Sequence, residues 1–394
     1  MITSVMPTYA RIDVAFERGE GVYLFDTNGR RYLDFVAGIA VDALGHCHPH
    51  LVEQLTSQVG KLWHTSNLYR VPGQEKLADR LVANTFADSV FFTNSGAEAI
   101  ECSLKAARRY HATNGAPERF RVICANNAFH GRTLATIAAG GQAKHLDGFG
   151  PVVEGFDHVP FGNMNEMRAA ITPETAAILV EPVQGEGGVT PAPEGYLKAL
   201  RETADEFGIL LIFDEVQCGV ARSGKFFAHE WSGITPDVMA VAKGIGGGFP
   251  VGACLAVEKV ALALSAGTHG TTYGGNPLAM SAANAVLDIV LEDGFMGHVE
   301  QSGRYLRRQL EGLVSKYPSL LADVRGMGLM LGLKCVEEGK NAILNGKLFE
   351  LGLLTALAGD NVVRFVPPLI VTQDQIDEAI TIIDNACQSL GAEG

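Results

Sequence analysis

Three short runs of consecutive apolar residues stand out along the chain, at 176–180, 209–213 and 238–242. Each run is followed directly by an acid or a lysine. A strand that is apolar at every position is buried on both faces, as in parallel sheets covered by helices. The pattern therefore predicts an α/β fold with a mostly parallel central sheet.

The N-terminal part of the chain has a different pattern. Residues 1–50 contain two apolar runs around Asn28-Gly29, a dipeptide that favours a hairpin turn. Apolar residues then recur at helical spacing in 51–63 and 74–86. We expect a small β-rich segment followed by two helices.

The composition shifts again near residue 291. A charged helical stretch covers 293–317, and the chain ends in a helix whose first residues, Thr372 to Gln375, form a capping-box sequence. This tail is typical of a separate α+β domain. The predicted division is an N-terminal segment 1–50, a large domain 51–290 and a C-terminal small domain 291–394, which the N-terminal segment joins.

Length and composition narrow the functional classes. The chain has 394 residues, enough for two domains, and 19% of them are charged. The formal charge of −13 argues against a nucleic-acid partner, which requires clustered Lys and Arg. Neither a signal peptide nor an apolar run of about 18 residues is present, so no membrane association is expected. The seven cysteines include no CxxC pair, which favours reduced thiols and a cytoplasmic location.

The charged residues at the strand ends are the first candidates for chemistry. Parallel strands place their carboxyl ends at one edge of a sheet, where open α/β sheets bind ligands, and Glu181 belongs to that edge. Lys243 could be an ordinary solvated lysine or a nucleophile that forms a Schiff base. Asp214 favours the nucleophile, because a buried carboxylate needs a cation such as a protonated pyridine nitrogen. The pair predicts pyridoxal 5′-phosphate as the cofactor, with Lys243 and Asp214 as catalytic residues.

Two strand-to-helix loops carry further candidates. The turn at Ser95-Gly96 precedes a helix whose free backbone N–H groups can bind phosphate, although an ordinary turn has the same sequence features. A second loop presents Phe129, which can stack on a planar ring, and Arg132, which can bind a carboxylate.

A metal site was the alternative at the alternating imidazoles of His46, His48 and His50. Pro49 interrupts this run, and no supporting carboxylate is expected nearby. We therefore predict a loop that enters a helix, and no metal.

Several strings match a known family in order along almost the whole chain. They are YLDFVAGIAVDALGHCHP, WHTSNLY, FFTNSGAEA, AFHGRT, VEPVQGEGG, FDEVQ, THGTTYGGNPLA and RFVPPL. The chain resembles the class III (subgroup II) pyridoxal-phosphate aminotransferases of fold type I, and among them the acetylornithine aminotransferases. The resemblance implies a homodimer with shared active sites.

The resemblance also implies a role for individual residues. Lys243 looks like the lysine that binds the cofactor and moves the substrate proton, and Asp214 like the partner of the pyridinium. The other cofactor residues implied are Ser95, Gly96 and Ala97 at the phosphate, Phe129 on the ring, Gln217 near the phenolic oxygen, and Thr272 from the neighbouring subunit.

Three residues are implied for the substrates. Arg132 resembles the residue that binds the distal carboxylate, and Arg364 the one that binds the α-carboxylate of glutamate. Glu186 resembles a switch that neutralises Arg364 when an ω-amine is bound instead. One pocket could then accept two different amines.

The expected activity is ping-pong transfer of an amino group between glutamate and N-acetylglutamate 5-semialdehyde, which gives N2-acetylornithine in arginine synthesis. The alternatives are an ornithine, succinylornithine, N-succinyl-diaminopimelate or 4-aminobutyrate aminotransferase, because a small pocket change alters discrimination by only about 1 to 3 kcal/mol. Arg364 with Glu186 argues against a racemase or decarboxylase of the same fold. Lys243 with Asp214 argues against a binding protein without activity.

Overall fold

The apolar runs form the centre of a seven-stranded sheet. The computed structural model describes residues 4–392. In this sheet the neighbours from β11 to β6 are all parallel, and β12 runs antiparallel to both of its neighbours. The strand order is β4 (Ser89–Thr93), β12 (Gly252–Ala256), β11 (Val238–Val241), β10 (Leu210–Asp214), β7 (Thr175–Val180), β5 (Arg121–Ala125) and β6 (Phe156–Val159). The predicted α/β fold with a mostly parallel sheet is confirmed.

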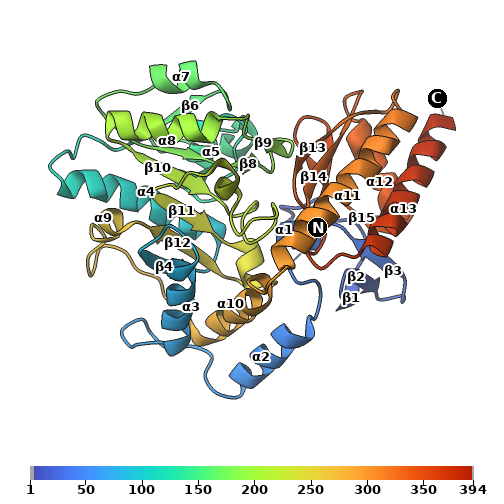
Figure 1. Ribbon diagram of the computed structural model, residues 1–394, viewed down its shortest axis with the longest axis horizontal. Coiled ribbons are helices and arrows are strands. Elements are labelled where there is room, and N and C mark those ends of the chain that lie inside the picture. Colours follow the sequence, from blue (N-terminus) through green and yellow to red (C-terminus); the bar gives the residue numbers. More distant parts are fainter. Residues whose placement is uncertain (1–3, 393–394) are drawn as a thin grey trace.

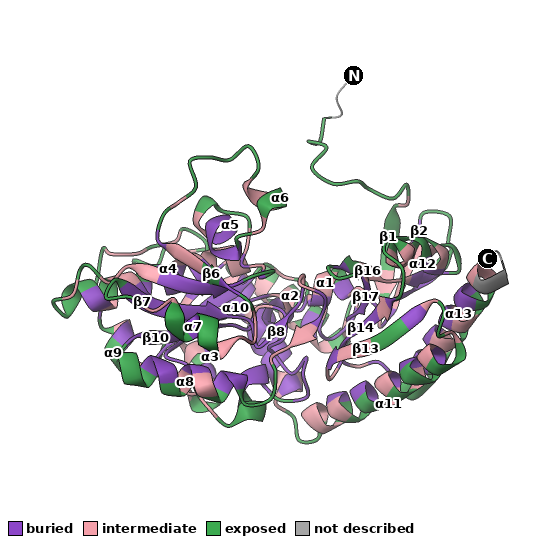
Figure 2. Cartoon of the chain, turned by 90° about the horizontal axis from the view of Figure 1, so that it is seen from above, coloured by how far each residue is buried: buried purple, intermediate pink, exposed green. Residues whose placement is uncertain are grey.

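Helices cover both faces of this sheet, which explains why its central strands are apolar at every position. On one face Leu179 and Ile212 pack in the same cluster as α4 (Gly96–Thr113). On the other face Ile178 and Leu211 pack against α8 (Tyr196–Phe207). Figure 2 shows the buried strands between these two helices. Full burial of each such side chain stabilises the fold by about 1.5 to 3 kcal/mol.

The register of the central strands brings their charged ends together. Phe213 of β10 pairs with Val180 of β7, and Asp214 pairs with Ala240 of β11. The residues that follow β7 and β11 therefore lie beside Asp214 at the carboxyl edge of the sheet.

A second lobe is built from the C-terminal part of the chain together with the N-terminal strands (Figure 1). Its antiparallel sheet has the order β13 (Leu321–Met327), β14 (Met330–Cys335), β17 (Val362–Phe365) and β16 (Ala356–Ala358). Against it pack α11 (Phe295–Lys316) and α12 (Lys340–Glu350), and α13 (Gln373–Ala392) packs against these two helices. A further sheet joins β1 (Phe16–Glu20), β2 (Tyr23–Asp26) and β3 (Arg31–Asp34) to β15 (Leu353–Leu354). The N-terminal strands thus lie in the small lobe, while the exact domain boundaries at residues 50 and 290 stay a prediction.

Local sequence signals agree with the observed elements. The hairpin predicted at Asn28-Gly29 connects β2 to β3, with Gly29 in the left-handed region at φ +80°. The capping box is also present, because Thr372 N–H donates to Gln375 Oε1 at 2.9 Å and Gln375 N–H to Thr372 Oγ1 at 3.4 Å.

Within 4–392 none of the helices has the length and apolar character that a membrane span needs. The remaining elements complete the two lobes. The helices are α1 (Ala37–Ala40), α2 (Pro49–Val59), α3 (Pro72–Ala83), α5 (Leu134–Gly140), α6 (Ala143–Leu146), α7 (Met164–Ala169), α9 (Glu258–Ala261) and α10 (Pro277–Val290). A small hairpin joins β8 (Val183–Gln184) to β9 (Thr190–Pro191), and two 3₁₀ turns cover Ala228–Ser232 and Lys243–Gly246.

The contact between α11 and the turn from β13 to β14 predicts a stability effect. A Cβ at Gly303 would lie 2.4 Å from the carbonyl oxygen of Gly328, which is backbone and cannot move aside. We expect Gly303→Ala to lower the free energy of unfolding by about 1 to 3 kcal/mol, measured by urea denaturation. Gly312→Ala, on the same helix and in open space, should raise it by up to about 1 kcal/mol. Equal effects of the two substitutions would contradict this packing.

Candidate active site

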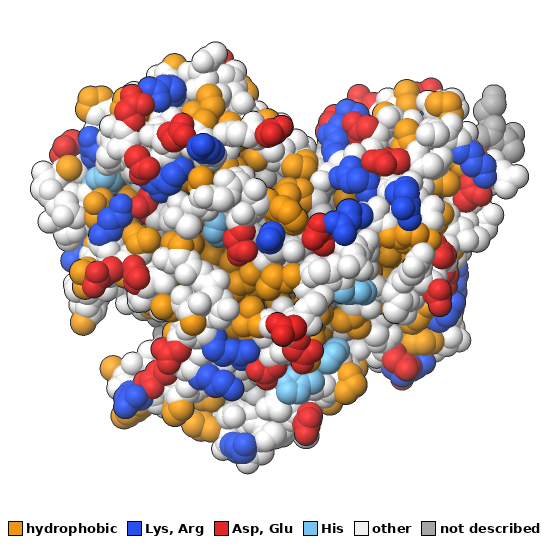
Figure 3. Space-filling model, in the orientation of Figure 1, with side chains coloured by type: hydrophobic (Ala, Val, Ile, Leu, Met, Phe, Trp, Pro, Cys, Tyr) orange, Lys and Arg blue, Asp and Glu red, His pale blue; other side chains and the backbone are white. Residues whose placement is uncertain are grey.

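A cavity of about 440 Å³ opens at the carboxyl edge of the large sheet. Figure 3 shows that the surface is also hollowed between the two lobes, where apolar side chains are exposed. The predicted site residues that line the cavity are Ser95, Gly96, Ala97, Phe129, Arg132, Glu186, Asp214, Gln217 and Lys243. The fold thus collects residues from five separate stretches of sequence at one place.

Asp214, the last residue of β10, has a fixed orientation at the cavity wall. Its Oδ2 lies 2.7 Å from Nδ1 of the buried His130, and its Oδ1 accepts the Val216 N–H at 3.0 Å. Burial lowers the pKa of the His130 imidazole, but the hydrogen bond and charge of Asp214 outweigh it, so the pKa is raised overall. His130 was not among the predicted site residues, although its loop was. Within 4–392 its Nε2 has no hydrogen-bond partner.

Lys243 follows the end of β11 after one residue, Ala242, and begins a 3₁₀ turn. Its backbone has φ +50°, a left-handed conformation that is uncommon for a residue with a side chain and often marks a functional site. Among the residues that the structure describes, its amine makes neither a hydrogen bond nor an ion pair. Burial, and then repulsion by Arg364, lowers the pKa of this amine. A larger neutral fraction makes it a better nucleophile.

The N-terminus of α4 forms another part of the cavity wall. Ser95 is the N-cap, and its hydroxyl accepts the Glu98 N–H at 3.3 Å. A Cβ at Gly96 would lie only 2.8 Å from Cγ1 of Val216, so the backbone approaches the cavity wall closely because glycine stands there. The helix has 18 residues, and the N–H groups of its first turn can bind an anion such as phosphate.

Arg364 of β17 is buried, and Glu186 and Gln217 satisfy one of its terminal nitrogens. Its Nη1 donates to Glu186 Oε1 at 2.6 Å and to Gln217 Oε1 at 3.0 Å. Glu186 is 31% exposed in its side chain and Arg364 only 2%. A Cβ at Gly185 would lie 2.3 Å from Gln217 Oε1, so glycine is required beside this contact. The sequence separates this ion pair by 178 residues, and only the fold joins it.

Arg132 and Thr272 have different environments. Arg132 is exposed at the cavity and lies 5.5 Å from the centroid of the Phe129 ring, without any ion pair in the described part of the chain. Its guanidinium is therefore available to a carboxylate. Thr272 is exposed and lines a separate hollow with Glu98 and Glu101, so one chain by itself does not bring it to the cavity.

Residues 5–387 of this chain match the model of a protein family described as "Aminotransferase class-III". The chain belongs to the class III aminotransferases. The predicted family is confirmed, and with it the prediction of an enzyme that transfers amino groups with the help of pyridoxal phosphate.

Individual relatives cover this aminotransferase almost completely. The acetylornithine aminotransferase of Brucella melitensis is 59% identical over 391 residues, which is 98% of this chain and 96% of the relative. The ornithine aminotransferase structure from Toxoplasma gondii has a TM-score of 0.95 at 31% identity and covers 99% of this chain and 94% of that one. The N-acetylornithine aminotransferase structure from Stenotrophomonas maltophilia has a TM-score of 0.86 at 36% identity and covers 98% of each chain.

The aminotransferase has a second buried carboxylate, which the sequence placed at the sheet edge but to which no role was assigned. Glu181 follows β7, is 5% exposed and lines the cavity. It accepts the N–H groups of Phe129 and Gly185, each at 3.2 Å, and so connects two loops of the site. The pKa of Glu181 is raised to about 7, chiefly by burial; the charge of His130 acts to lower it and that of Asp214 to raise it. Its place at a strand end was the only signal in the sequence.

The alternating histidines of this aminotransferase contact different partners. His46 Nε2 lies 2.8 Å from Asp34 Oδ2, and His50 Nε2 lies 2.9 Å from Asp288 Oδ2. The assumption that no carboxylate lies near these histidines was wrong, because Asp34 and Asp42 both lie beside His46. Asp42 stands only four residues before His46, and the fold brings the more distant Asp34 to the same imidazole.

The cavity has the features that pyridoxal phosphate requires. Asp214 is a fixed carboxylate for a ring cation, Lys243 is an amine without a partner among residues 4–392, and the N-terminus of α4 offers backbone N–H groups to a phosphate. The volume of about 440 Å³ lies in the range of small-molecule sites. These observations fit the cofactor that the sequence predicts.

The raised pKa of Glu181 predicts a pH effect on stability. Its ordinary value of 4.5 applies to the unfolded chain and about 7 to the folded one, so its contribution to stability is fully present below about pH 4.5 and is lost as pH rises through 7. Between pH 5 and 8 the cofactor-free wild type should lose on the order of 1 to 3 kcal/mol relative to Glu181→Gln. Urea denaturation across this range measures the difference.

Glu174→Gln, at the exposed position just before β7, is the matched control for that measurement. It should follow the wild type at every pH. A constant difference between wild type and Glu181→Gln from pH 5 to 8 would contradict the assignment.

Proposed function

We propose that this aminotransferase transfers the amino group of glutamate to N-acetylglutamate 5-semialdehyde, which yields N2-acetylornithine and 2-oxoglutarate, a step of arginine synthesis. The observation that carries the proposal is the arginine arrangement at the cavity. Arg364 is neutralised by Glu186, whereas Arg132 has no ion pair with any residue that the structure describes. Such a site accepts one substrate whose single carboxylate binds Arg132. It also accepts another substrate with two carboxylates, which bind Arg132 and Arg364. The acetylornithine aminotransferases at 58 and 59% identity support the choice of substrate.

The residues of the cavity would divide the work on the cofactor. When bound, pyridoxal phosphate accepts the electrons of the substrate carbon and carries the amino group between substrates. Lys243 would hold the cofactor covalently and move the substrate proton, helped by its lowered pKa. Asp214, oriented by His130, would keep the ring nitrogen protonated.

Three further contacts would fix the orientation of the cofactor. Backbone N–H groups of Ser95, Gly96 and Ala97 would bind its phosphate at the start of α4. Phe129 would cover one face of the ring. Gln217, whose Oε1 accepts a hydrogen bond from Arg364, would lie near the phenolic oxygen of the cofactor.

The contact of Arg364 with Glu186 would act as the switch between the two substrates. When N2-acetylornithine is bound, Glu186 stays on Arg364 and no second carboxylate is needed. When glutamate is bound, its α-carboxylate would replace Glu186 on the same arginine, so the buried cation is paired in both states. Arg132 would bind the remaining carboxylate in each case.

We further propose a homodimer in the cytoplasm. Thr272 lies outside the cavity of its own chain, in a hollow that shares Asn94 with it. Exposed apolar side chains, Leu68, Tyr69 and Tyr273, lie on the segments around that hollow and could be covered by a second copy. The partner subunit's Thr272 would then complete the phosphate site.

Single-turnover spectroscopy of the purified enzyme tests the substrate. N2-acetylornithine, N2-succinylornithine, ornithine and 4-aminobutyrate are added separately, and loss of the absorption of the lysine-bound cofactor is followed. We expect the fastest conversion with N2-acetylornithine and no conversion by Lys243→Ala. Faster conversion of ornithine, the substrate named for the Toxoplasma gondii relative, would replace the proposed substrate by that amine.

The switch predicts a selective effect of Glu186→Ala. The variant leaves the buried Arg364 unpaired while an ω-amine is bound, so the ratio of N2-acetylornithine to glutamate half-reaction rates should fall about tenfold or more. Glu186→Gln keeps a hydrogen-bond acceptor and should have a smaller effect. Stopped-flow measurement of both half-reactions gives the ratio, and an unchanged ratio in Glu186→Ala would remove the switch.

A further inference from the structure

The loop that carries Glu186 receives a backbone contact from the other lobe. Glu186 lies between β8 and β9, outside regular structure. Its carbonyl oxygen accepts the N–H of Gly359, which belongs to the small lobe, at 2.8 Å. A Cβ at Gly359 would lie 2.9 Å from that oxygen, and one at Gly188 would lie 3.0 Å from the Gly359 oxygen. The two backbones are therefore in close contact, without side chains between them.

The contacting residue Gly359 begins a tight turn that connects β16 to β17. The next two residues, Asp360 and Asn361, both have left-handed backbones, at φ +53° and +59°. These conformations are unfavourable for residues with side chains and persist only where the surroundings hold them. Asn361 is held by its amide, which donates to the carbonyl oxygens of Cys335 at 2.8 Å and Glu337 at 2.6 Å.

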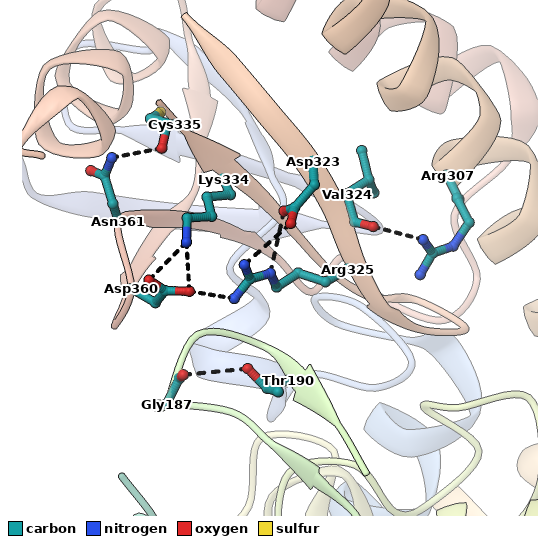
Figure 4. A network of polar contacts seen from close by, with 10 residues as sticks. All are labelled: Gly187, Thr190, Arg307, Asp323, Val324, Arg325, Lys334, Cys335, Asp360 and Asn361. Atoms are coloured by element: carbon teal, nitrogen blue, oxygen red, sulfur yellow. Dashed lines mark hydrogen bonds and ion pairs between the residues drawn. The ribbon is translucent and has the colours of Figure 1, made fainter. Parts of the chain in front are cut away.

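Asp360 is held by two cations (Figure 4). Lys334 Nζ lies 2.9 Å from both of its carboxylate oxygens, and Arg325 Nη1 lies 2.6 Å from Oδ2. The same arginine also contacts Asp323, at 3.2 and 3.3 Å. The hydrogen bond from Lys334, and then that from Arg325, lowers the pKa of Asp360. Figure 4 shows this cluster directly opposite the loop segment from Gly187 to Thr190.

Open space beside the loop and the turn makes the contact with Gly359 important. Glu186 lines the active-site cavity and also a hollow of about 700 Å³, to which Arg325 and Asp360 contribute. The carboxylate of Glu186 is held at Arg364, but its backbone has room to move away from the cavity. Without the turn, the loop could relax into the hollow and carry Glu186 with it.

We propose that the turn 359–361, anchored through Asp360 to Lys334 and Arg325, positions Glu186 for the substrate switch. Asp360 is thus a positioning residue that sets the preference between an ω-amine and glutamate without touching either. This inference rests on the proposed function. It also assigns β13 and β14, which carry Arg325 and Lys334, a part in substrate choice.

Asp360→Asn in the holoenzyme tests the inference, because asparagine accepts left-handed backbone while the charge that attracts the cations is lost. We expect the ratio of N2-acetylornithine to glutamate half-reaction rates to fall by about threefold to tenfold, in the direction of Glu186→Ala. Hydrogen exchange of the Gly359 amide, measured on the cofactor-free protein, should be about fivefold faster or more. Lys334→Met should change both quantities in the same direction and serves if Asp360→Asn does not fold.

Asp323→Asn is the matched control, since Asp323 contacts the same arginine but not the turn. It should leave both the rate ratio and the exchange of Gly359 at wild-type values. The inference is overturned if Asp360→Asn and Asp323→Asn behave alike, or if exchange rises while the rate ratio stays constant. Failure of Glu186→Ala to change the ratio would instead remove the switch itself, and exchange at Gly359 would still report whether Asp360 holds the turn.

Discussion

The parallel pairing of β7, β10 and β11 is the constraint on which the active site depends. Backbone hydrogen bonds align the carboxyl ends of these strands, so Glu181, Asp214 and Lys243 must meet at one edge of the sheet. Helices cover both faces, and charges at such an edge are costly unless they are paired. His130 pairs with Asp214, and backbone N–H groups pair with Glu181. Lys243 remains without a partner among the described residues, which suits a group that must react.

Substrate alternation depends on a second constraint, the buried cation of Arg364. The small lobe carries this arginine and a loop of the large lobe carries Glu186, so their contact exists only when the lobes are assembled. A buried arginine needs one carboxylate, and it does not matter whether the protein or the substrate supplies it. Exchange of one carboxylate for another therefore keeps the charge balanced. The position of the loop then decides how readily Glu186 competes, which connects the turn 359–361 to specificity.

Predictions from the sequence were most accurate where short-range interactions decide the structure. The Asn28-Gly29 hairpin and the capping box of the last helix depend on residues within four positions of each other, and both are present. The continuous apolar runs also identified strands of the parallel sheet, because burial on both faces leaves a direct trace in the residues. Helix ends were less accurate. The helix predicted to reach residue 63 ends at Val59, since helix ends depend on packing and solvent contacts that no local pattern records.

The sequence by itself determined the fold class, the family and a set of candidate residues, because strand burial and ordered motifs are properties of continuous segments. Tertiary structure alone decided which of these residues meet. In the folded chain His130 contacts Asp214, and Glu181 connects two loops. Asp34 contacts His46, and Arg364 contacts Glu186. The tertiary structure also left Thr272 outside the cavity of its own chain. Such contacts join residues far apart in sequence, and their geometry follows from strand register and lobe packing, which no single segment encodes.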